Sequence, residues 1–182
     1  MTDKKSKAYI IKKYFILEII IVLAVLALDI FLKKYSEKYL INNPKVFIPG
    51  VINLVYVENR GAAFGILQNA LVFFIILTVI ALAAFIFFLY KKRDGHFLLK
   101  FALVLIISGT AGNFIDRVKA GYVIDMIELQ FMEFAVFNIA DSALTVGTVL
   151  FAIYYLFIYK EPVKEPVKQT PEAVTGDDIN NE

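Results

Sequence analysis

The chain has 182 residues, a net charge of +2 and an apolar composition in which 59% of the residues are hydrophobic and 20% are charged. A soluble domain of this length buries too small a core to absorb so much apolar sequence, and a nearly neutral chain does not indicate a nucleic-acid partner. Because the chain has no cysteine and one histidine, we expect no metal, no cofactor and no catalysis by a thiolate or an imidazole.

Four apolar runs follow one another along the chain, each close to the length at which a helix crosses the hydrocarbon core of a bilayer. They cover residues 14–32, 70–90, 97–115 and 139–159. Only a helix satisfies its own backbone hydrogen bonds in lipid. The expected fold class is therefore an all-α integral membrane protein with four transmembrane helices, whose membrane domain spans residues 14–160.

The link between the first two runs is long for a bare connector. Its residues 46–57 are rich in β-branched and aromatic side chains, which favours strands over helix. Residues 122–127, between the third and fourth runs, are also strand-like, and Asp125 interrupts them. We expect a small extracytoplasmic β element that lies on the outer membrane surface.

The distribution of lysine and arginine near the ends of the runs predicts the orientation of the chain. These residues are abundant in the N-terminal tail 1–13, in the link 91–96 and just after residue 160. Both termini and this link are therefore expected in the cytoplasm. Residues 161–182 contain a duplicated Glu-Pro-Val-Lys and an acidic end, and this composition predicts a disordered cytoplasmic tail.

With this topology, polar residues from every helix gather at the outer face of the membrane. Ionisable groups at membrane depth are costly, so they are candidates for function. Glu18 is the exception, since it lies nearer the cytoplasmic end. The segments that meet at the outer face are Asp29 with Lys33, residues 59–65, residues 112–117, Asp125, and Asn138 with Asp141.

Most of these residues also have a purely structural interpretation. Asn138 and Asp141 have the residue types and spacing of a helix N-cap and its third helical position. Asp29 and Lys33 are one turn apart and can form an ion pair whose lysine reaches toward the interface. Asp125 taken alone fits a solvated loop carboxylate. The residue types leave these alternatives open.

Four sequence blocks, taken together, resemble the prolipoprotein signal peptidase family, also called signal peptidase II. They occur in the order and at the spacing of the family, and they cover residues 29–147. Ile30 and Met126 stand where the family usually has Gln and Phe. The blocks are Asp29 with Lys33; Asn-Arg-Gly-Ala-Ala-Phe-Gly at 59–65; Gly-Asn-Phe-Ile-Asp-Arg at 112–117 with Gly-Tyr-Val-Ile-Asp at 121–125; and Phe-Asn-Ile-Ala-Asp-Ser-Ala at 137–143.

This resemblance implies an intramembrane aspartic endopeptidase of the bacterial cytoplasmic (inner) membrane. Such enzymes remove the signal peptide from diacylglyceryl-modified prolipoproteins by cutting before the lipidated cysteine, and cyclic lipopeptides inhibit them. The resemblance implies that Asp125 and Asp141 are the catalytic pair. It suggests substrate-binding or dyad-orienting roles for Asn59, Gly61, Asn113, Arg117 and Asn138. We expect structural support from Asp29, Lys33 and Asp116.

Two neighbouring carboxyl groups are sufficient for peptide hydrolysis without metal, Cys or His. They cannot both ionise cheaply, so they share a proton, and one acts as base while the other acts as acid. We expect Asp141 to ionise more readily because it lies at a helix N-terminus. Arg117 is better suited to hold a loop or a carboxylate than to take part in the chemistry.

Two other classes of function compete with a peptidase. An ion or proton transporter would use Asp29, Asp116 and Asp141 as a relay, although transporters usually place such groups near the membrane midplane. A membrane assembly factor would not require these sequence blocks to occur together in one chain. Membrane lipid is an expected partner in every case.

Overall fold

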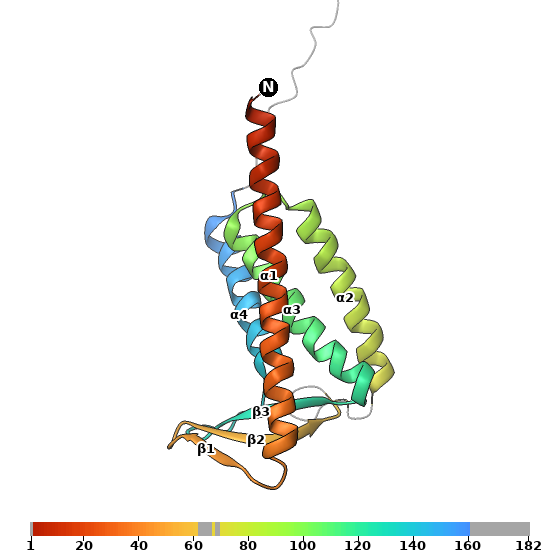
Figure 1. Cartoon of the computed structure of the whole chain (residues 1–182), viewed down its shortest axis with the longest axis vertical. Coiled ribbons are helices and arrows are strands. Elements are labelled where there is room, and N and C mark those ends of the chain that lie inside the picture. The colour runs from red at the N-terminus through yellow and green to blue at the C-terminus, as the bar shows by residue number, and fades with distance from the viewer. Residues whose placement is uncertain (1, 62–66, 68–69, 161–182) are drawn as a thin grey trace, which may run out of the picture.

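The computed structural model describes residues 2–61, 67 and 70–160, with side chains from residue 14 onward. The disordered tail expected at 161–182 lies outside these residues. Figure 1 shows helices that run along the long axis of the molecule and a small sheet across one end. The elements in chain order are α1 (Thr2–Tyr39), β1 (Lys45–Ile48), β2 (Ile52–Asn59), α2 (Leu71–Lys91), α3 (Phe97–Ala120), β3 (Val123–Leu129), α4 (Ile139–Ile153) and the π-helical η2 (Tyr154–Ile158).

The four predicted transmembrane helices are confirmed in number and order. Four stretches are long and apolar enough to cross a membrane, and they are Tyr14–Tyr39, Leu71–Lys91, Phe97–Ala120 and Ile139–Ile158. Many large apolar side chains of α1, α2 and α4 are exposed on the outside of the bundle. This is expected for helices that lipid surrounds, because lipid tails are as apolar as leucine.

The boundaries of two helices differ from those expected. Helix α1 begins at Thr2 and ends at Tyr39, so it extends beyond 14–32 in both directions and includes most of the expected tail. Helix α3 continues past residue 115 to Ala120, where Gly121 ends it with a φ of 82°. Glycine adopts this left-handed conformation at little cost. Hydropathy marks where lipid contact ends, whereas glycine marks where the helix itself ends.

Helix α3 forms the centre of the bundle and packs against α1, α2 and α4. Most of its residues between Leu99 and Asn113 are buried. Two glycines permit its close approach to α4. A Cβ atom at Gly109 would overlap the carbonyl oxygen of Ala140, and a Cβ atom at Gly147 of α4 would lie 2.8 Å from the carbonyl oxygen of Ala102.

The substitution Gly109→Ala is therefore expected to lower the free energy of unfolding by about 1–3 kcal/mol, the usual cost of overpacking. The added methyl group forces α3 and α4 apart. Denaturant unfolding in detergent micelles measures the change. Val149→Ile is the matched control, because it also adds one carbon but on an exposed part of α4. Equal stability of the two variants would contradict the packing described here.

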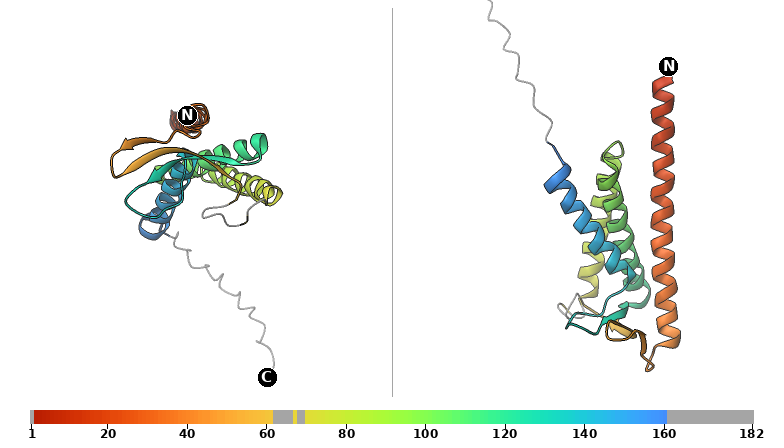
Figure 2. Two further views of the ribbon diagram at one scale, coloured as in Figure 1. Left: turned by 90° about the horizontal axis from the view of Figure 1, so that it is seen from below. Right: turned by 90° about the vertical axis from the view of Figure 1, so that its left-hand side faces the viewer.

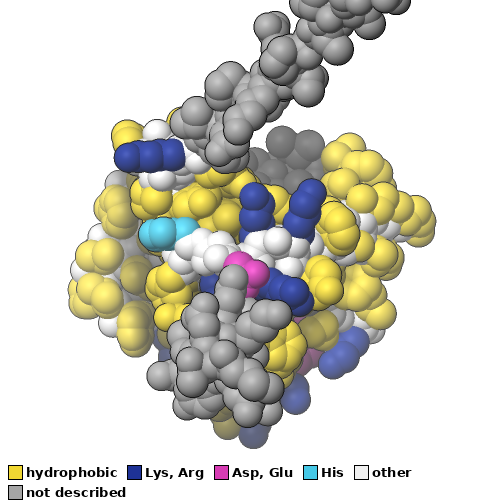
Figure 3. All heavy atoms as spheres, turned by 90° about the horizontal axis from the view of Figure 1, so that it is seen from above, with side chains coloured by type: hydrophobic (Ala, Val, Ile, Leu, Met, Phe, Trp, Pro, Cys, Tyr) yellow, Lys and Arg dark blue, Asp and Glu magenta, His cyan; other side chains and the backbone are white. Residues whose placement is uncertain are grey.

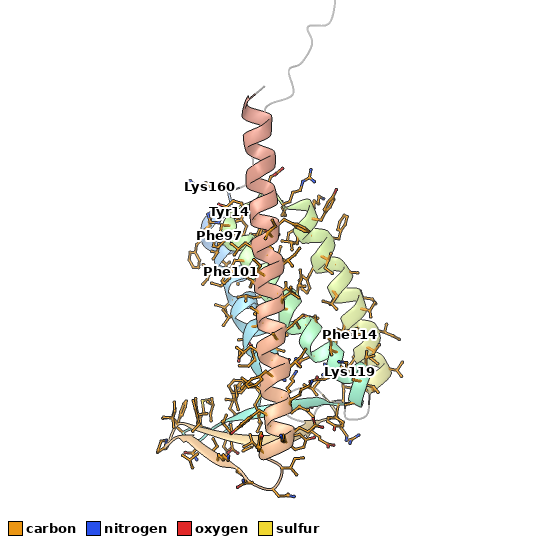
Figure 4. All side chains as sticks on the ribbon, viewed as in Figure 1. Tyr14, Phe97, Phe101, Phe114, Lys119 and Lys160 are labelled. Carbon is orange, nitrogen blue, oxygen red and sulfur yellow. The ribbon has the colours of Figure 1, made fainter. Side chains whose placement is uncertain are left out.

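The end of the bundle away from the sheet carries its own polar contacts. Lys100 on α3 is buried, lies 3.3 Å from Glu18 on α1 and places its ammonium group 4.4 Å from the centre of the Tyr14 ring. Figure 4 shows Tyr14, Phe97 and Phe101 together at this end, and Lys119 at the end near the sheet. Glu18 thus pairs between two helices, away from the other polar residues.

The β element predicted beside the bundle is confirmed as a three-stranded antiparallel sheet in the order β1-β2-β3. Figure 2 shows it beneath the helix ends. Asn59 at the end of β2 pairs with Val123, and Val57 pairs with Asp125. Ser36 of α1 donates a hydrogen bond of 2.8 Å to the carbonyl oxygen of Val55, which attaches the sheet to the bundle. Asp125 therefore belongs to a strand and not to a solvated loop.

Candidate active site

A cavity of about 520 Å³ lies where the sheet meets the helix ends, and both candidate catalytic aspartates line it. Its wall has a polar part and an apolar part. Of the seven residues predicted for catalysis and substrate binding, six line the cavity: five polar side chains and Gly61. The seventh, Asn138, is fully buried. The lining residues are Asn59, Gly61, Asn113, Arg117, Val123, Asp125, Leu129, residues 134–137, Asp141, Ser142 and residues 144–146.

Asp125 projects from β3 and is 2% exposed. Its Oδ1 accepts a hydrogen bond of 2.7 Å from the amide of Asn138, and its Oδ2 accepts one of 2.9 Å from the amide of Asn59. Burial raises the pKa of Asp125 to about 6, the charge of Asp141 adds to this rise, and the two amide hydrogen bonds oppose it. The carboxyl group therefore takes up a proton far more readily than an exposed aspartate does.

Asp141 lies in the first turn of α4, with Asn138 as the N-cap. The backbone N–H of Asp141 donates to Oδ1 of Asn138 at 2.8 Å, and Oδ2 of Asp141 accepts from the backbone N–H of Asn138 at 3.2 Å. This reciprocal pair is a capping box. Oδ1 of Asp141 also accepts a hydrogen bond of 2.7 Å from the amide of Asn113. The capping interpretation is thus correct, and it coexists with a place in the cavity wall.

Two buried asparagines connect the aspartates. The amide of Asn138 donates both to Asp125 and, at 3.2 Å, to Oδ1 of Asn113. Asn113 in turn donates to Asp141. Asn138 is fully buried and Asn113 is 9% exposed, so the surrounding packing restricts both amides. Each carboxyl group is held by two donors, which fixes the orientation of one group relative to the other.

Arg117 connects α3 to the end of β2. Its Nη2 donates to the carbonyl oxygen of Gly61 at 3.2 Å, and its guanidinium group lies 4.8 Å from the centre of the Phe74 ring. Asn59 binds the same backbone, because its Oδ1 accepts from the N–H of Gly61 at 3.0 Å. The predicted role of Arg117 in holding a loop agrees with these contacts. Residues 62–65 of the same block lie outside the described residues.

Lys33 lies outside the cavity wall and contacts a residue of that wall, Asn113. Its Nζ lies 2.7 Å from Oδ2 of Asp29, 2.7 Å from Oδ2 of Asp116 and 3.4 Å from Oδ1 of Asn113. Oδ1 of Asp29 accepts from the backbone N–H of Ala140 at 3.0 Å, which satisfies a further donor at the start of α4. Lys33 is 2% exposed. The predicted ion pair with Asp29 is present, and the buried carboxylate of Asp29 together with the half-buried one of Asp116 holds the lysine inside the bundle.

The apolar part of the cavity wall was not predicted from the sequence. Residues 134–137 form one side of it, and their position depends on a bridge in which Ile127 of β3 pairs with Phe137. Leu144, Thr145 and Val146 of α4 form another side. Only Thr145 had a signal in the sequence, because it follows Asp141 by four residues and so shares its helix face.

Comparison with solved structures defines the class of protein to which this fold and this cavity belong. Two structures, each described as a bacterial membrane enzyme structure, superpose with TM-scores of 0.73 and 0.72 at 34% and 36% sequence identity. The matches cover 81% and 78% of this chain and 94% of each structure. The molecule is therefore a membrane enzyme with several membrane-embedded helices.

The chain belongs to the signal peptidase II family, since the family model for signal peptidase (SPase) II matches residues 21–157. Lipoprotein signal peptidases of Streptococcus thermophilus and Streptococcus pyogenes are 48% and 45% identical to it over 141 and 143 residues. These matches cover 77% and 78% of this chain and 90% and 92% of the relatives. Its function is thus the removal of signal peptides from prolipoproteins, and the transporter and assembly-factor alternatives find no support.

Proposed function

We propose that this signal peptidase is of the aspartic type and that Asp125 and Asp141 are its catalytic pair. The observation that carries the proposal is their convergence on one cavity from a strand and a helix, with Asn138 bonded to both. A cavity at which two carboxyl groups meet supplies an acid and a base for hydrolysis. The remaining predicted site residues orient this pair.

The reaction proceeds through a water molecule that lies between the two carboxyl groups. Asp141 takes a proton from the water as its oxygen attacks the scissile carbonyl carbon. Asp125 donates its proton to the carbonyl oxygen, and the tetrahedral intermediate forms. Proton transfer from Asp141 to the amide nitrogen then allows the C–N bond to break, while a hydroxyl of the intermediate returns its proton to Asp125, which restores the starting pair. The raised pKa of Asp125 supports this division of roles, because the group that starts protonated must hold its proton near neutral pH.

The proposed substrate is a diacylglyceryl-modified prolipoprotein, cut just before the lipidated cysteine. The apolar part of the cavity wall supports this substrate, since Leu129, Val136 and Leu144 offer contacts to a signal peptide or to acyl chains. Each buried CH₂ group of a lipid chain contributes about 0.8 kcal/mol to membrane binding. The family resemblance adds cyclic lipopeptides as expected inhibitors.

The proposed location is the bacterial cytoplasmic membrane, with the cavity near its outer face. Figure 3 shows the end of the molecule opposite the sheet, where lysine and arginine side chains gather around the helix ends. Helix α2 ends at the basic run Lys91, Lys92 and Arg93. Basic residues favour the cytoplasmic side. The proposed orientation therefore has both termini on the cytoplasmic side and the sheet on the outer side.

Cleavage by the purified protein in lipid or detergent tests this proposal. The enzyme is supplied with one prolipoprotein in two forms, with and without the diacylglyceryl group, and the new N-terminus is identified by mass spectrometry. We expect cleavage before the modified cysteine and little cleavage of the unmodified form. Added chelator is expected to leave the rate unchanged. A rate that requires added metal would contradict the aspartic mechanism.

The variant Asn59→Ala is expected to move the alkaline limb of the pH profile of kcat/KM to higher pH by roughly one unit. Asn59 donates to the charged carboxylate of Asp125, which lowers its pKa. Removing this donor therefore raises the pKa of Asp125. Activity is lost as pH rises through the pKa of the group that holds the shared proton, so the loss occurs later in the variant.

Asn53→Ala is the matched control for this shift, since Asn53 lies on the same strand and bonds Glu128 outside the cavity. Its alkaline limb is expected to coincide with that of the wild type. An Asn59→Ala limb that stays in place, or that moves to lower pH, would show that Asp125 does not hold the proton. Rates across the pH range, measured at low substrate concentration, provide both profiles.

A further inference from the structure

The serine and threonine hydroxyls of α3 and α4 follow one pattern with a single exception. Ser108, Thr110, Ser142 and Thr148 each donate to the backbone carbonyl four residues earlier, at distances between 2.6 and 3.0 Å. This bond spares a hydroxyl in apolar surroundings the cost of having no partner. Thr145 is the exception: within the described residues its hydroxyl makes no hydrogen bond.

Thr145 is also distinctive among the residues that line the cavity. Of the polar side chains in the described wall, it is the one without a hydrogen-bond partner. A ligand that enters the cavity therefore meets one hydroxyl that is not already engaged. The other polar side chains of the wall, all of which are bonded, are Asn59, Asn113, Arg117, Asp125, Asp141 and Ser142.

Thr145 is exposed on α4, away from the face that packs against α3. Ala140, Ala143 and Gly147 form the face of α4 that is buried, and Gly147 is in close contact with α3. Thr145 lies on the face of Asp141, one helical turn farther from the sheet. Its neighbours in the wall, Leu144 and Val146, are apolar. The hydroxyl is thus a single polar group in the apolar part of the cavity, one turn from the catalytic pair.

We propose that Thr145 is a substrate-binding residue whose hydroxyl donates to a carbonyl oxygen of the bound prolipoprotein. This inference rests on the proposed role of the cavity as the active site. A carbonyl that enters the apolar part loses its hydrogen bonds to water, and an unpaired one is costly to bury. The backbone of the signal peptide and the ester groups of the diacylglyceryl group both carry such carbonyls, and the shared chemistry is a carbonyl acceptor.

The variant Thr145→Val, which keeps the side-chain shape and removes the hydroxyl, tests this role. We expect its KM to rise about three- to tenfold, the range of one hydrogen bond, with kcat and the pH profile unchanged. Thr145→Ser keeps the hydroxyl and is expected to stay within about twofold of the wild-type KM. Thr78→Val is the control on α2, because Thr78 lies outside the cavity wall.

Two substrates distinguish the sources of the carbonyl. One prolipoprotein carries the diacylglyceryl group with ester bonds, and the other carries ether bonds, which have no carbonyl oxygen. A rise in KM for Thr145→Val on the ester substrate alone assigns the bond to the lipid ester. An equal rise on both substrates assigns it to the peptide backbone. Either result supports the proposal, and partial unfolding does not imitate it because KM is independent of the amount of active enzyme.

The variant Asp141→Asn separates this inference from the proposed function. If Asp141→Asn is inactive and Thr145→Val keeps the wild-type KM on both substrates, the inference is overturned while the active site stands. A loss in Thr145→Ser equal to that in Thr145→Val overturns it as well, since the hydroxyl is then not what matters. A fall in the kcat of Thr145→Val with its KM unchanged also overturns the inference. Full activity of Asp141→Asn would instead contradict the proposed function.

Discussion

The substitutions Asp125→Asn and Asp141→Asn are each expected to lower the rate of prolipoprotein cleavage by about 10³- to 10⁴-fold, the contribution of a general acid or base. An asparagine keeps the shape of the side chain but neither takes nor gives a proton under these conditions. The dyad then lacks either the base that activates water or the acid that protonates the carbonyl oxygen. Initial rates with purified variants in detergent micelles measure the effect.

A matched substitution controls for the general effect of removing a carboxylate. Asp94 is exposed in the turn between α2 and α3, outside the cavity wall. Asp94→Asn is expected to cleave at the wild-type rate. Thermal unfolding checks that the two cavity variants are folded, since their asparagine side chains fill the same volume. A cavity variant that cleaves as fast as Asp94→Asn would remove that aspartate from the mechanism.

The substitution Lys33→Met is expected to lower the free energy of unfolding by about 3–5 kcal/mol, the cost of leaving buried charges without their partner. Lys33 lies 2.7 Å from a carboxylate oxygen of Asp29 and from one of Asp116. Its removal leaves the buried carboxylate of Asp29 and the half-buried carboxylate of Asp116 without their cation. Denaturant unfolding of the purified variant in micelles measures the change.

The neighbouring residue provides the control for Lys33. Lys34 is exposed on the same helix, so Lys34→Met changes the same chemical groups without removing a buried partner. It is expected to shift the free energy of unfolding by less than about 0.5 kcal/mol. Adding Asp116→Asn to Lys33→Met removes one of the two unpaired charges and is expected to restore part of the lost stability. Equal stability of Lys33→Met and Lys34→Met would show that the ion pairs contribute little.

The parts of the fold that follow from local sequence were predictable. Each transmembrane helix is encoded by its own run of apolar residues, because one segment satisfies its backbone and meets lipid by itself. The capping box of α4 was predictable for the same reason, since Asn138 and Asp141 lie within one turn. The end of α3 at Gly121 was also visible in the sequence, but the polar residues after 115 drew the predicted boundary too early.

The parts that depend on contacts between distant segments were not predictable from residue types. The sequence indicates that Lys33 pairs with Asp29, which is four residues away, but its second partner, Asp116, requires the register of α1 against α3. Asp125 had a loop alternative until β2 was seen to pair with β3. Thr145 had a spacing signal, yet its lack of a partner became visible only with the cavity wall in place.

The central claim is that Asp125 and Asp141 act as one unit, and single-turnover cleavage by the two single variants and the double variant tests it most directly. Residues that act together are not additive, so removal of one abolishes the function of both. We predict that Asp125→Asn, Asp141→Asn and the double variant all fall to the same residual rate. A double variant slower than either single by the product of their separate losses, or a single variant within tenfold of the wild type, would contradict the claim.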